Sequence, residues 1–172
     1  MIINKNNTIP IRKRLKELFF DYLVILLYLV LLFGIAMSVY IFFFKGIPEM
    51  NELQAQLTAI LTSVIPIILN FSYLDYSKDG SFGKRKAGLT LVYKEKSIKA
   101  SLIRNGIKFF PWQLGHISTI HGIYTNFDTL SIMLSIVSMT CGLLLLLMAL
   151  LRQDKRHLGD LLANTQVQLN GK

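Results

Sequence analysis

The stretch YLVILLYLVLLFGIAMSVYIFFF, from Tyr22 to Phe44, decides the fold of this chain. It holds 23 consecutive residues without a formal charge, and about 20 apolar residues are enough for a helix to cross a hydrocarbon core roughly 30 Å thick. A secretory signal peptide also joins basic residues to an apolar run, but that run is about 7–15 residues long and ends at a small-residue cleavage site. Here the run is longer and ends in bulky side chains, so we predict a transmembrane helix.

The composition of the whole chain agrees with a membrane protein. Of its 172 residues, 52% are hydrophobic and only 17% are charged, which is richer in apolar residues than an ordinary soluble domain. The formal net charge is +9, yet no fingerprint of a nucleic-acid-binding module accompanies the basic residues. Basic residues beside membrane spans orient a chain and attract anionic lipid. We therefore expect membrane lipids, and not nucleic acid, as partners.

Two other segments have the length and hydropathy of membrane spans, and a third is ambiguous. We predict spans at about 18–44, 57–76 and 127–151. Segment 102–125 mixes charged side chains, Arg104 and Lys108 among them, with aromatic ones. It either crosses as an atypical span, with both cations snorkelling toward the cytoplasm, or lies in the interface as a helix with a basic polar face and an aromatic apolar face.

The distribution of basic residues helps to decide between a crossing and an interfacial helix, because Lys and Arg near helix ends tend to stay cytoplasmic. They gather in segments 1–17, 77–101 and 152–172, whereas the loop 46–56 carries two acids and no Lys or Arg. Both termini are then cytoplasmic and the number of crossings must be even, so we favour four crossings over three. The predicted fold class is an all-α transmembrane helix bundle with four membrane segments and a small cytoplasmic β-containing cap, within one domain over 1–172.

The cap is predicted from two short segments outside the spans. A turn-rich stretch, KDGSFG at 78–83, precedes a segment at 89–93 whose alternation indicates a strand, and 165–169 alternates again. Two or three such strands can pair. The adjacent Gly83 and Lys84 lack the earlier glycine and the following Ser or Thr of a phosphate loop, so nucleotide binding is not expected.

Polar residues inside the predicted spans are candidates for function. Asp21 follows Arg14 by seven residues, which returns nearly to the same helix face, and an intramembrane acid is by default a functional-site hypothesis. The alternative is an interfacial charge pair that holds helix orientation. In the second span, Pro66 leaves the Thr62 carbonyl without its helical partner, and Asn70 lies nearby on the same face. We favour a packed bend, satisfied by Ser, Thr or water, over an ion or proton site.

The remaining polar residues indicate packing more than chemistry. Four small residues recur at helical spacing in the last span: Ser131, Ser135, Ser138 and Gly142. Such a stripe permits close helix approach. His116 and His121 are five apart and do not share a helix face, so we expect no metal site. No catalytic pair stands out, and we expect neither an enzyme nor a cofactor.

Three separated segments resemble the RDD family of bacterial membrane proteins, named for an arginine and two aspartates. They are RLKELFFD at 14–21, DGSFGKRKAGLTLV at 79–92 and HLGDLLANTQV at 157–167. Their order and spacing agree with the family across almost the whole chain. The sequence departs from the family pattern at Lys16 and Glu17, where small apolar residues are usual, and this weakens the case for a simple local pairing of Arg14 with Asp21.

The resemblance implies which residues matter and what they do. Arg14, Asp21 and Asp160 take the three eponymous positions. The accompanying family pattern includes Asp79, Gly80, Gly83, Lys84, Gly88 and Thr165. The implied location is the bacterial inner or plasma membrane, and some family members are linked to cation/proton exchange.

Two functions follow as expectations. The first is a transporter, homo-oligomeric or with a membrane partner protein, that exchanges protons for sodium or another monovalent cation. Asp21 would bind the ion, and Arg14, Asn70 and Asp160 would complete the charge network. The second is a non-transporting membrane adaptor or scaffold that binds a partner protein or anionic lipid through its basic cytoplasmic face.

Overall fold

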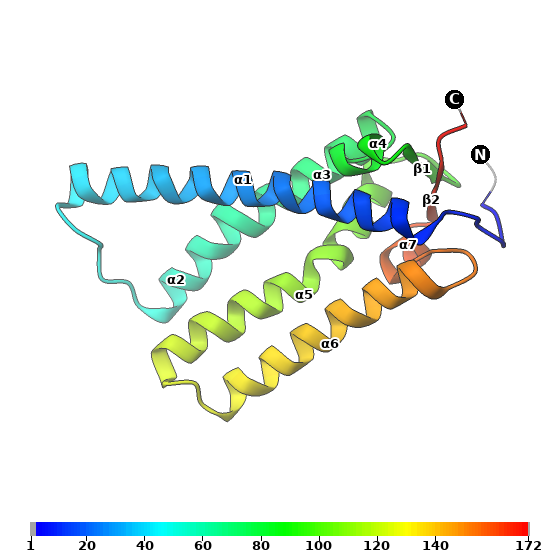
Figure 1. Ribbon diagram of the computed structural model, residues 1–172. Coiled ribbons are helices and arrows are strands. Elements are labelled where there is room, and N and C mark those ends of the chain that lie inside the picture. The colour runs from blue at the N-terminus through cyan, green and yellow to red at the C-terminus, as the bar shows by residue number, and fades with distance from the viewer. Residues whose placement is uncertain (1–2, 172) are drawn as a thin grey trace.

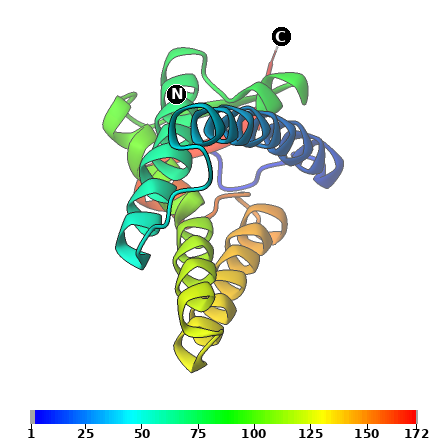
Figure 2. The same ribbon diagram turned by 90° about the vertical axis from the view of Figure 1, so that its left-hand side faces the viewer.

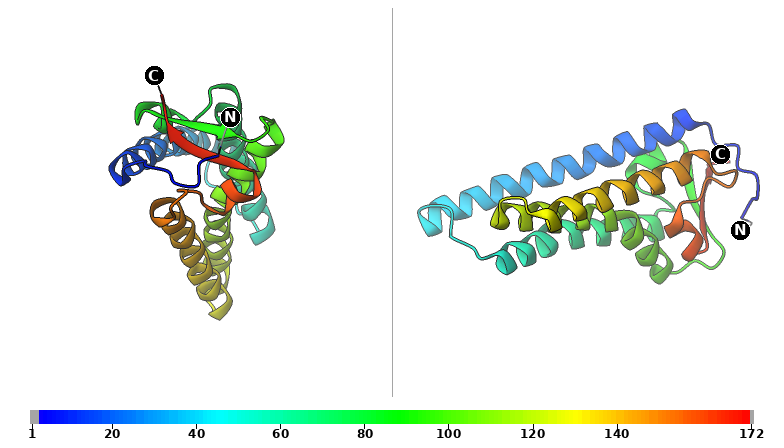
Figure 3. Two further views of the ribbon diagram at one scale, coloured as in Figure 1. Left: turned by 90° about the vertical axis from the view of Figure 1, so that its right-hand side faces the viewer. Right: turned by 90° about the horizontal axis from the view of Figure 1, so that it is seen from below.

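The computed structural model describes residues 3–171, and most of them are helical (Figure 1). The elements in chain order are α1 (Ile11–Phe44), α2 (Glu52–Ala59), the π-helical turn η1 (Ile60–Val64), α3 (Ile65–Ser77), α4 (Phe82–Lys86), β1 (Leu89–Tyr93), α5 (Ile98–Thr125), α6 (Thr129–Leu151), α7 (Leu158–Leu162) and β2 (Thr165–Leu169). Helices extend away from a two-stranded sheet that lies near both termini (Figures 1 and 3). We call this the sheet end, and the opposite end the loop end.

Among residues 3–171, three helical segments are long and apolar enough to cross a membrane, namely α1, the continuous run Glu52–Ser77, and α6. In α1 the buried residues are all charged: Arg14, Glu17 and Asp21. Large apolar side chains such as Leu27 and Phe33 point outward and are exposed. This pattern is the reverse of a soluble helix, whose apolar stripe faces the core. It suits a helix whose surroundings are lipid.

Helices α5 and α6 form an antiparallel hairpin closed by residues 126–128 at the loop end (Figure 1). The hairpin diverges from α1 (Figure 2). At the loop end, the Tyr124 hydroxyl donates to the Met50 carbonyl, and His121 Nδ1 lies 2.8 Å from the carboxylate of Glu52. The tip of the α5–α6 hairpin therefore contacts the connection between α1 and α2.

The α5–α6 seam contains the predicted stripe of small residues. Ser138 donates to the Pro111 carbonyl at 2.7 Å, and Ser118 donates to the Ser131 carbonyl at 2.7 Å. A Cβ at Gly142 would lie 3.7 Å from the Pro111 ring, so the helices approach closely there. The interpretation of the stripe as a packing surface is confirmed.

The bend predicted at Pro66 is present, but its free carbonyl is satisfied differently from the expectation. The Thr62 carbonyl accepts a hydrogen bond from the Tyr28 hydroxyl of α1, and the chain before Pro66 forms the π-helical turn η1. A tyrosine from another helix therefore replaces the expected Ser, Thr or water. Asn70 lies on the exposed side of α3.

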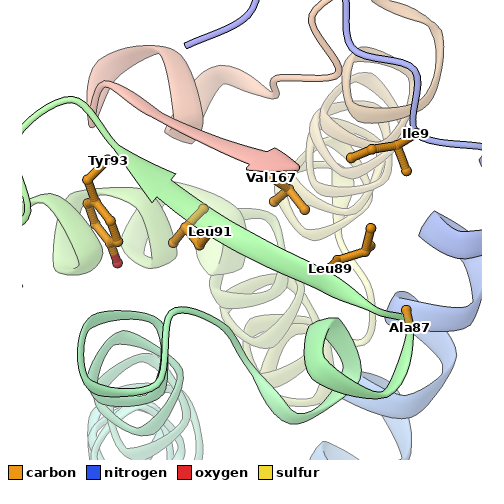
Figure 4. Packing of buried hydrophobic residues seen from close by; sticks show 6 residues of the cluster. All are labelled: Ile9, Ala87, Leu89, Leu91, Tyr93 and Val167. Carbon is orange, nitrogen blue, oxygen red and sulfur yellow. The ribbon is translucent and has the colours of Figure 1, made fainter. Parts of the chain in front are cut away.

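Both predicted strands exist and pair with each other. β1 and β2 run antiparallel with Leu91 opposite Val167, and no third strand occurs among residues 3–171. The sheet packs around a small apolar cluster: Ile9, Ala87, Leu89, Leu91, Tyr93 and Val167 (Figure 4). The cluster joins Ala87, at the end of α4, to both strands and to Ile9 in the segment before α1.

Candidate functional site

Eight charged side chains meet at the sheet end of the bundle. They are Arg14, Glu17 and Asp21 of α1, Asp75 of α3, Lys84 of α4, Arg104 and Lys108 of α5, and Asp160 of α7. Seven of them are buried, and the side chain of Lys108 is 18% exposed. The set contains four cations and four acids, so its formal charges cancel. We call it the charge network.

Asp75 is the centre of the network. Lys84 Nζ lies 3.0 Å from its Oδ1, and Arg104 Nη1 lies 2.8 Å from its Oδ2. Asn105 Nδ2 donates to the same Oδ2 at 3.0 Å. Both carboxylate oxygens are therefore paired, as a charge removed from water requires. Helices α3, α4 and α5 meet at this single side chain.

Asp160 joins α7 to the same group. It accepts from Arg104 Nε at 2.6 Å and from the Thr165 hydroxyl at 2.9 Å. Burial alone raises the pKa of Asp160, but the adjacent Arg104 guanidinium more than offsets this and holds the pKa below its ordinary value. Asp160 is consequently an anion at neutral pH, and Arg104 bridges it to Asp75.

His157, three residues before Asp160, is kept neutral. Burial lowers the pKa of His157 to about 4. Its Nδ1 accepts the Gly159 backbone N–H at 3.0 Å, which leaves the proton of the neutral ring on Nε2. That Nε2 has no hydrogen-bond partner among residues 3–171.

Asp21 bonds to α4 more closely than to any cation. It accepts from the Ser81 hydroxyl at 2.9 Å and from the Gly83 backbone N–H at 2.8 Å, while Lys108 Nζ lies 3.5 Å away. A Cβ at Gly83 would lie 2.2 Å from the Glu17 carbonyl oxygen and 2.6 Å from Asp21 Oδ1. Only glycine permits this approach of α4 to α1.

Arg14 contacts a different acid from the one its spacing suggested. Its Nη1 donates to Glu17 Oε2 at 2.9 Å, and its Nη2 donates to the Lys155 carbonyl at 2.6 Å. Glu17 also lies 3.6 Å from Lys84 Nζ. Glu17 thus connects Arg14 to the rest of the network.

The structure brings together some of the predicted residues and separates others. Arg14, Asp21, Gly83, Lys84, Asp160 and Thr165 lie in or directly beside the network. Asn70 is exposed on α3. Asp79 is exposed and pairs with Lys96 at 2.6 Å. Gly80 and Gly88 take positive φ values of 153° and 68° in the turns that flank α4.

Sequence reasoning missed several members of the site: Glu17, Asp75, Ser81, Arg104, Asn105, Lys108 and His157. If segment 102–125 crosses the membrane, Arg104 and Lys108 were expected to snorkel, but Arg104 points into the protein and pairs with two acids. The available signal was their spacing of four residues, which places both on one helix face. Asp75 stands near the end of an apolar run and offered a second signal.

Comparison with known proteins gives one match. The model of the RDD family matches residues 9–164, a range that includes Arg14, Asp21 and Asp160. The chain belongs to the RDD family. Neither the curated proteins nor the solved structures give a significant match. In this RDD protein Arg14, Asp21 and Asp160 lie in one charge network, on α1 and α7.

The described part of this RDD protein has no side-chain cluster suited to a metal ion. Within residues 3–171, no three His, Cys, Asp or Glu side chains are grouped to hold one. The carboxylates of the network face ammonium, guanidinium, amide and hydroxyl donors. The site is chemically an array of paired charges on α1, α3, α4, α5 and α7, with Lys108 at its more accessible edge.

Proposed function

We propose that α5 crosses the membrane as a fourth span, so that both termini share the cytoplasmic side with the sheet. Its 28 residues extend about 42 Å at 1.5 Å per residue. It runs antiparallel to α6 and reaches the loop end, where Tyr124 contacts Met50. Its charged side chains Arg104 and Lys108 face other helices, which is how polar residues are tolerated inside a bundle.

Single-cysteine labelling tests this topology. In a background with Cys141→Ser, cysteines at Gly46 and Asn126 should both react with an impermeant reagent added outside intact cells. A cysteine at Glu95, in the loop between β1 and α5, should react only after permeabilisation. An Asn126 cysteine that reacts only in permeabilised cells would rule out the fourth crossing.

We propose further that the protein exchanges protons for sodium or another monovalent cation, with Asp21 as the exchanging carboxylate. The supporting observation is the contact between Asp21 and Lys108. At 3.5 Å it is the longest contact of Asp21, and Lys108 is the most exposed cation of the network. Asp75, in contrast, is held by two closer cations and is fully buried.

The exchange follows from competition for one carboxylate. When the Lys108 ammonium gives up its proton, the carboxylate of Asp21 loses its cationic partner and can accept a metal cation, with the Ser81 hydroxyl oxygen beside it. When Lys108 binds a proton again, its ammonium displaces the cation. One proton thus replaces one monovalent cation. Asn70 takes no part, because it lies on the exposed side of α3.

Proton flux in proteoliposomes tests the mechanism. A sodium gradient should drive proton movement with the wild-type protein, and Asp21→Asn should abolish it. Lys108→Arg should also abolish it, because a guanidinium does not release its proton. The exposed Glu95→Gln variant serves as the control and should keep full flux. Absence of cation-dependent flux in wild type, or full flux in Asp21→Asn, would refute the proposal.

A second candidate is the membrane adaptor. It is favoured by the closed charge network, in which every acid is paired, and by the exposed lysines of the loops near β1, such as Lys94 and Lys96. A static network would hold this basic surface for a partner protein. A partner that copurifies in stoichiometric amount would support this function, and sodium-driven proton flux by the purified protein alone would oppose it.

A further inference from the structure

The charge network borders a cavity of about 180 Å³, well above the roughly 10–15 Å³ that one water molecule occupies. One wall comes from α6 and is aliphatic: Leu145, Leu146, Ala149 and Leu150. The opposite end is charged and consists of Arg14, Glu17, Arg104 and Lys108, together with His157. The cavity therefore has an apolar half and a cationic half, in which three cations outnumber one acid.

Two hydrogen-bond donors at the charged end are unused. Arg14 is only 4% exposed and His157 only 6%. Among residues 3–171, Arg14 Nε and His157 Nε2 have no hydrogen-bond partner. His157 Nε2 lies 3.3 Å from Asp160 Oδ2, but the contact lacks hydrogen-bond geometry. Buried donors without partners are costly. Both residues line the cavity, but the two nitrogen atoms are covered by protein atoms, so a ligand reaches them when these side chains turn toward the cavity.

The two unused donors and the apolar wall together define the ligand. Two N–H groups beside cationic side chains suit the oxygens of a phosphate, since arginine matches that geometry well. Inorganic phosphate would leave the aliphatic wall of α6 without a partner, whereas an acyl chain would cover it. Basic pockets between membrane helices bind the head groups of anionic lipids.

We propose that this cavity binds an anionic phospholipid. Its phosphate accepts from Arg14 Nε and His157 Nε2, and the start of one acyl chain lies along Leu145, Leu146 and Ala149. The site lies beside the Asp21–Lys108 contact but does not require ion exchange. It is also separate from the exposed lysines near β1.

Two substitutions remove the proposed donors while keeping the local structure. Arg14→Lys keeps a cation beside Glu17 and removes Nε. His157→Asn keeps a side-chain acceptor for the Gly159 N–H, since asparagine is a good helix N-cap, and removes Nε2. Ala149→Leu fills the apolar half, and Ala36→Leu makes the same change on α1 outside the cavity lining.

The experiment is a titration of delipidated protein in detergent, followed by native mass spectrometry. The probes are phosphatidylglycerol, phosphatidylcholine and diacylglycerol with the same acyl chains, and inorganic phosphate. Wild type should bind phosphatidylglycerol more tightly than phosphatidylcholine, and about tenfold more tightly than diacylglycerol, which has no phosphate, a difference of about 1.4 kcal/mol. Arg14→Lys and His157→Asn should each remove most of that preference, Ala149→Leu should weaken binding of the lipid, and Ala36→Leu should have no effect.

Other results would overturn the proposal. Equal binding of phosphatidylglycerol and diacylglycerol, or an unchanged preference in both donor variants with circular dichroism like that of wild type, would exclude a phosphate site in this cavity. Equal binding of phosphatidylglycerol and phosphatidylcholine would exclude selectivity for an anionic lipid. Tight binding of inorganic phosphate that Ala149→Leu leaves unchanged would indicate a soluble oxyanion as the ligand. The titration uses no ion gradient, so failure of lipid binding and failure of cation exchange are read independently.

Discussion

Arg104 donates from Nε to Oδ1 of Asp160 at 2.6 Å, although the two residues are 56 positions apart in the chain. The contact ties the middle of the chain to its C-terminal segment. It also explains how a guanidinium is accommodated in a long helix of a membrane protein, since the same side chain reaches Asp75 at 2.8 Å. A cation with two buried acids is stabilised by both, and each acid depends on it.

Removing Arg104 should therefore be far more damaging than removing an exposed cation. Arg104→Met leaves Asp75 and Asp160 buried with reduced pairing, and breaking a buried pair costs about 3–5 kcal/mol. The matched control is Lys96→Met, which breaks a pair whose side chains are 46% and 52% exposed and whose loss costs about 0–1 kcal/mol. Thermal unfolding in detergent should separate the two variants clearly. Similar unfolding temperatures would mean that the network contributes little to stability.

Acid should destabilise the sheet end in two stages. The pKa of His157 falls from 6.5 to about 4 on burial, so the unfolded chain binds a proton that the folded chain does not. A neutral, buried His157 therefore contributes on the order of 3 kcal/mol to the free energy of unfolding, at 1.36 kcal/mol per pKa unit. The full contribution is present above pH 6.5, and it is lost as the pH falls toward 4. The pKa of Asp160 is lowered by Arg104 despite burial. Its contribution to stability is therefore lost as the pH falls below the ordinary aspartate pKa of 3.8, which is the second stage.

The pH dependence can be assigned with one variant. His157→Asn cannot titrate, so its stability should change little between pH 6.5 and 4 while the later loss persists. Denaturant unfolding followed by circular dichroism at a series of pH values measures both. A wild-type profile that is flat from pH 6.5 to 4 would contradict a neutral, buried His157.

The membrane helices and strands were predictable from the sequence because they depend on local patterns. The uncharged run in α1 and the alternation at 89–93 and 165–169 each need only a short window. The predicted strands match β1 and β2 in their bounds. Hydropathy did not decide whether α5 crosses the membrane, because a hydropathy scale lowers the score for every charged residue, including those that are paired with an opposite charge.

The charge network was only partly predictable because its pairs are distant in sequence. Arg104 meets Asp75 from 29 positions away and Lys108 meets Asp21 from 87. Family resemblance pointed to Asp21 and Asp160, but it could not supply the cations that face them. The spacing of Arg14 and Asp21 suggested a local pair, but Glu17 lies between them and forms the ion pair with Arg14.

The contact between α1 and α4 should be intolerant of any side chain at position 83. In Gly83→Ala the new Cβ would lie 2.2 Å from the Glu17 carbonyl oxygen, so α4 must move and the hydrogen bond from its backbone to Asp21 is lost. Overpacking of this kind costs about 1–3 kcal/mol. Gly34→Ala is the control, because nothing lies within 4 Å of a Cβ there and alanine favours a helix interior. The thermal unfolding temperature should fall in Gly83→Ala and should not fall in Gly34→Ala.

The bend in the second membrane segment should depend on Tyr28. Tyr28→Phe removes the donor to the Thr62 carbonyl, which Pro66 also leaves without a helical partner. The bond lies on the surface of the bundle, and in a membrane span no water replaces it, so its loss should cost about 1–3 kcal/mol. Tyr22→Phe, on the exposed side of the same helix, should change little. In the double variant Tyr28→Phe with Pro66→Ala, the restored N–H can bond to Thr62, so most of the lost stability should return. Additive losses in this cycle would show that the tyrosine stabilises the bundle by some means other than the free carbonyl.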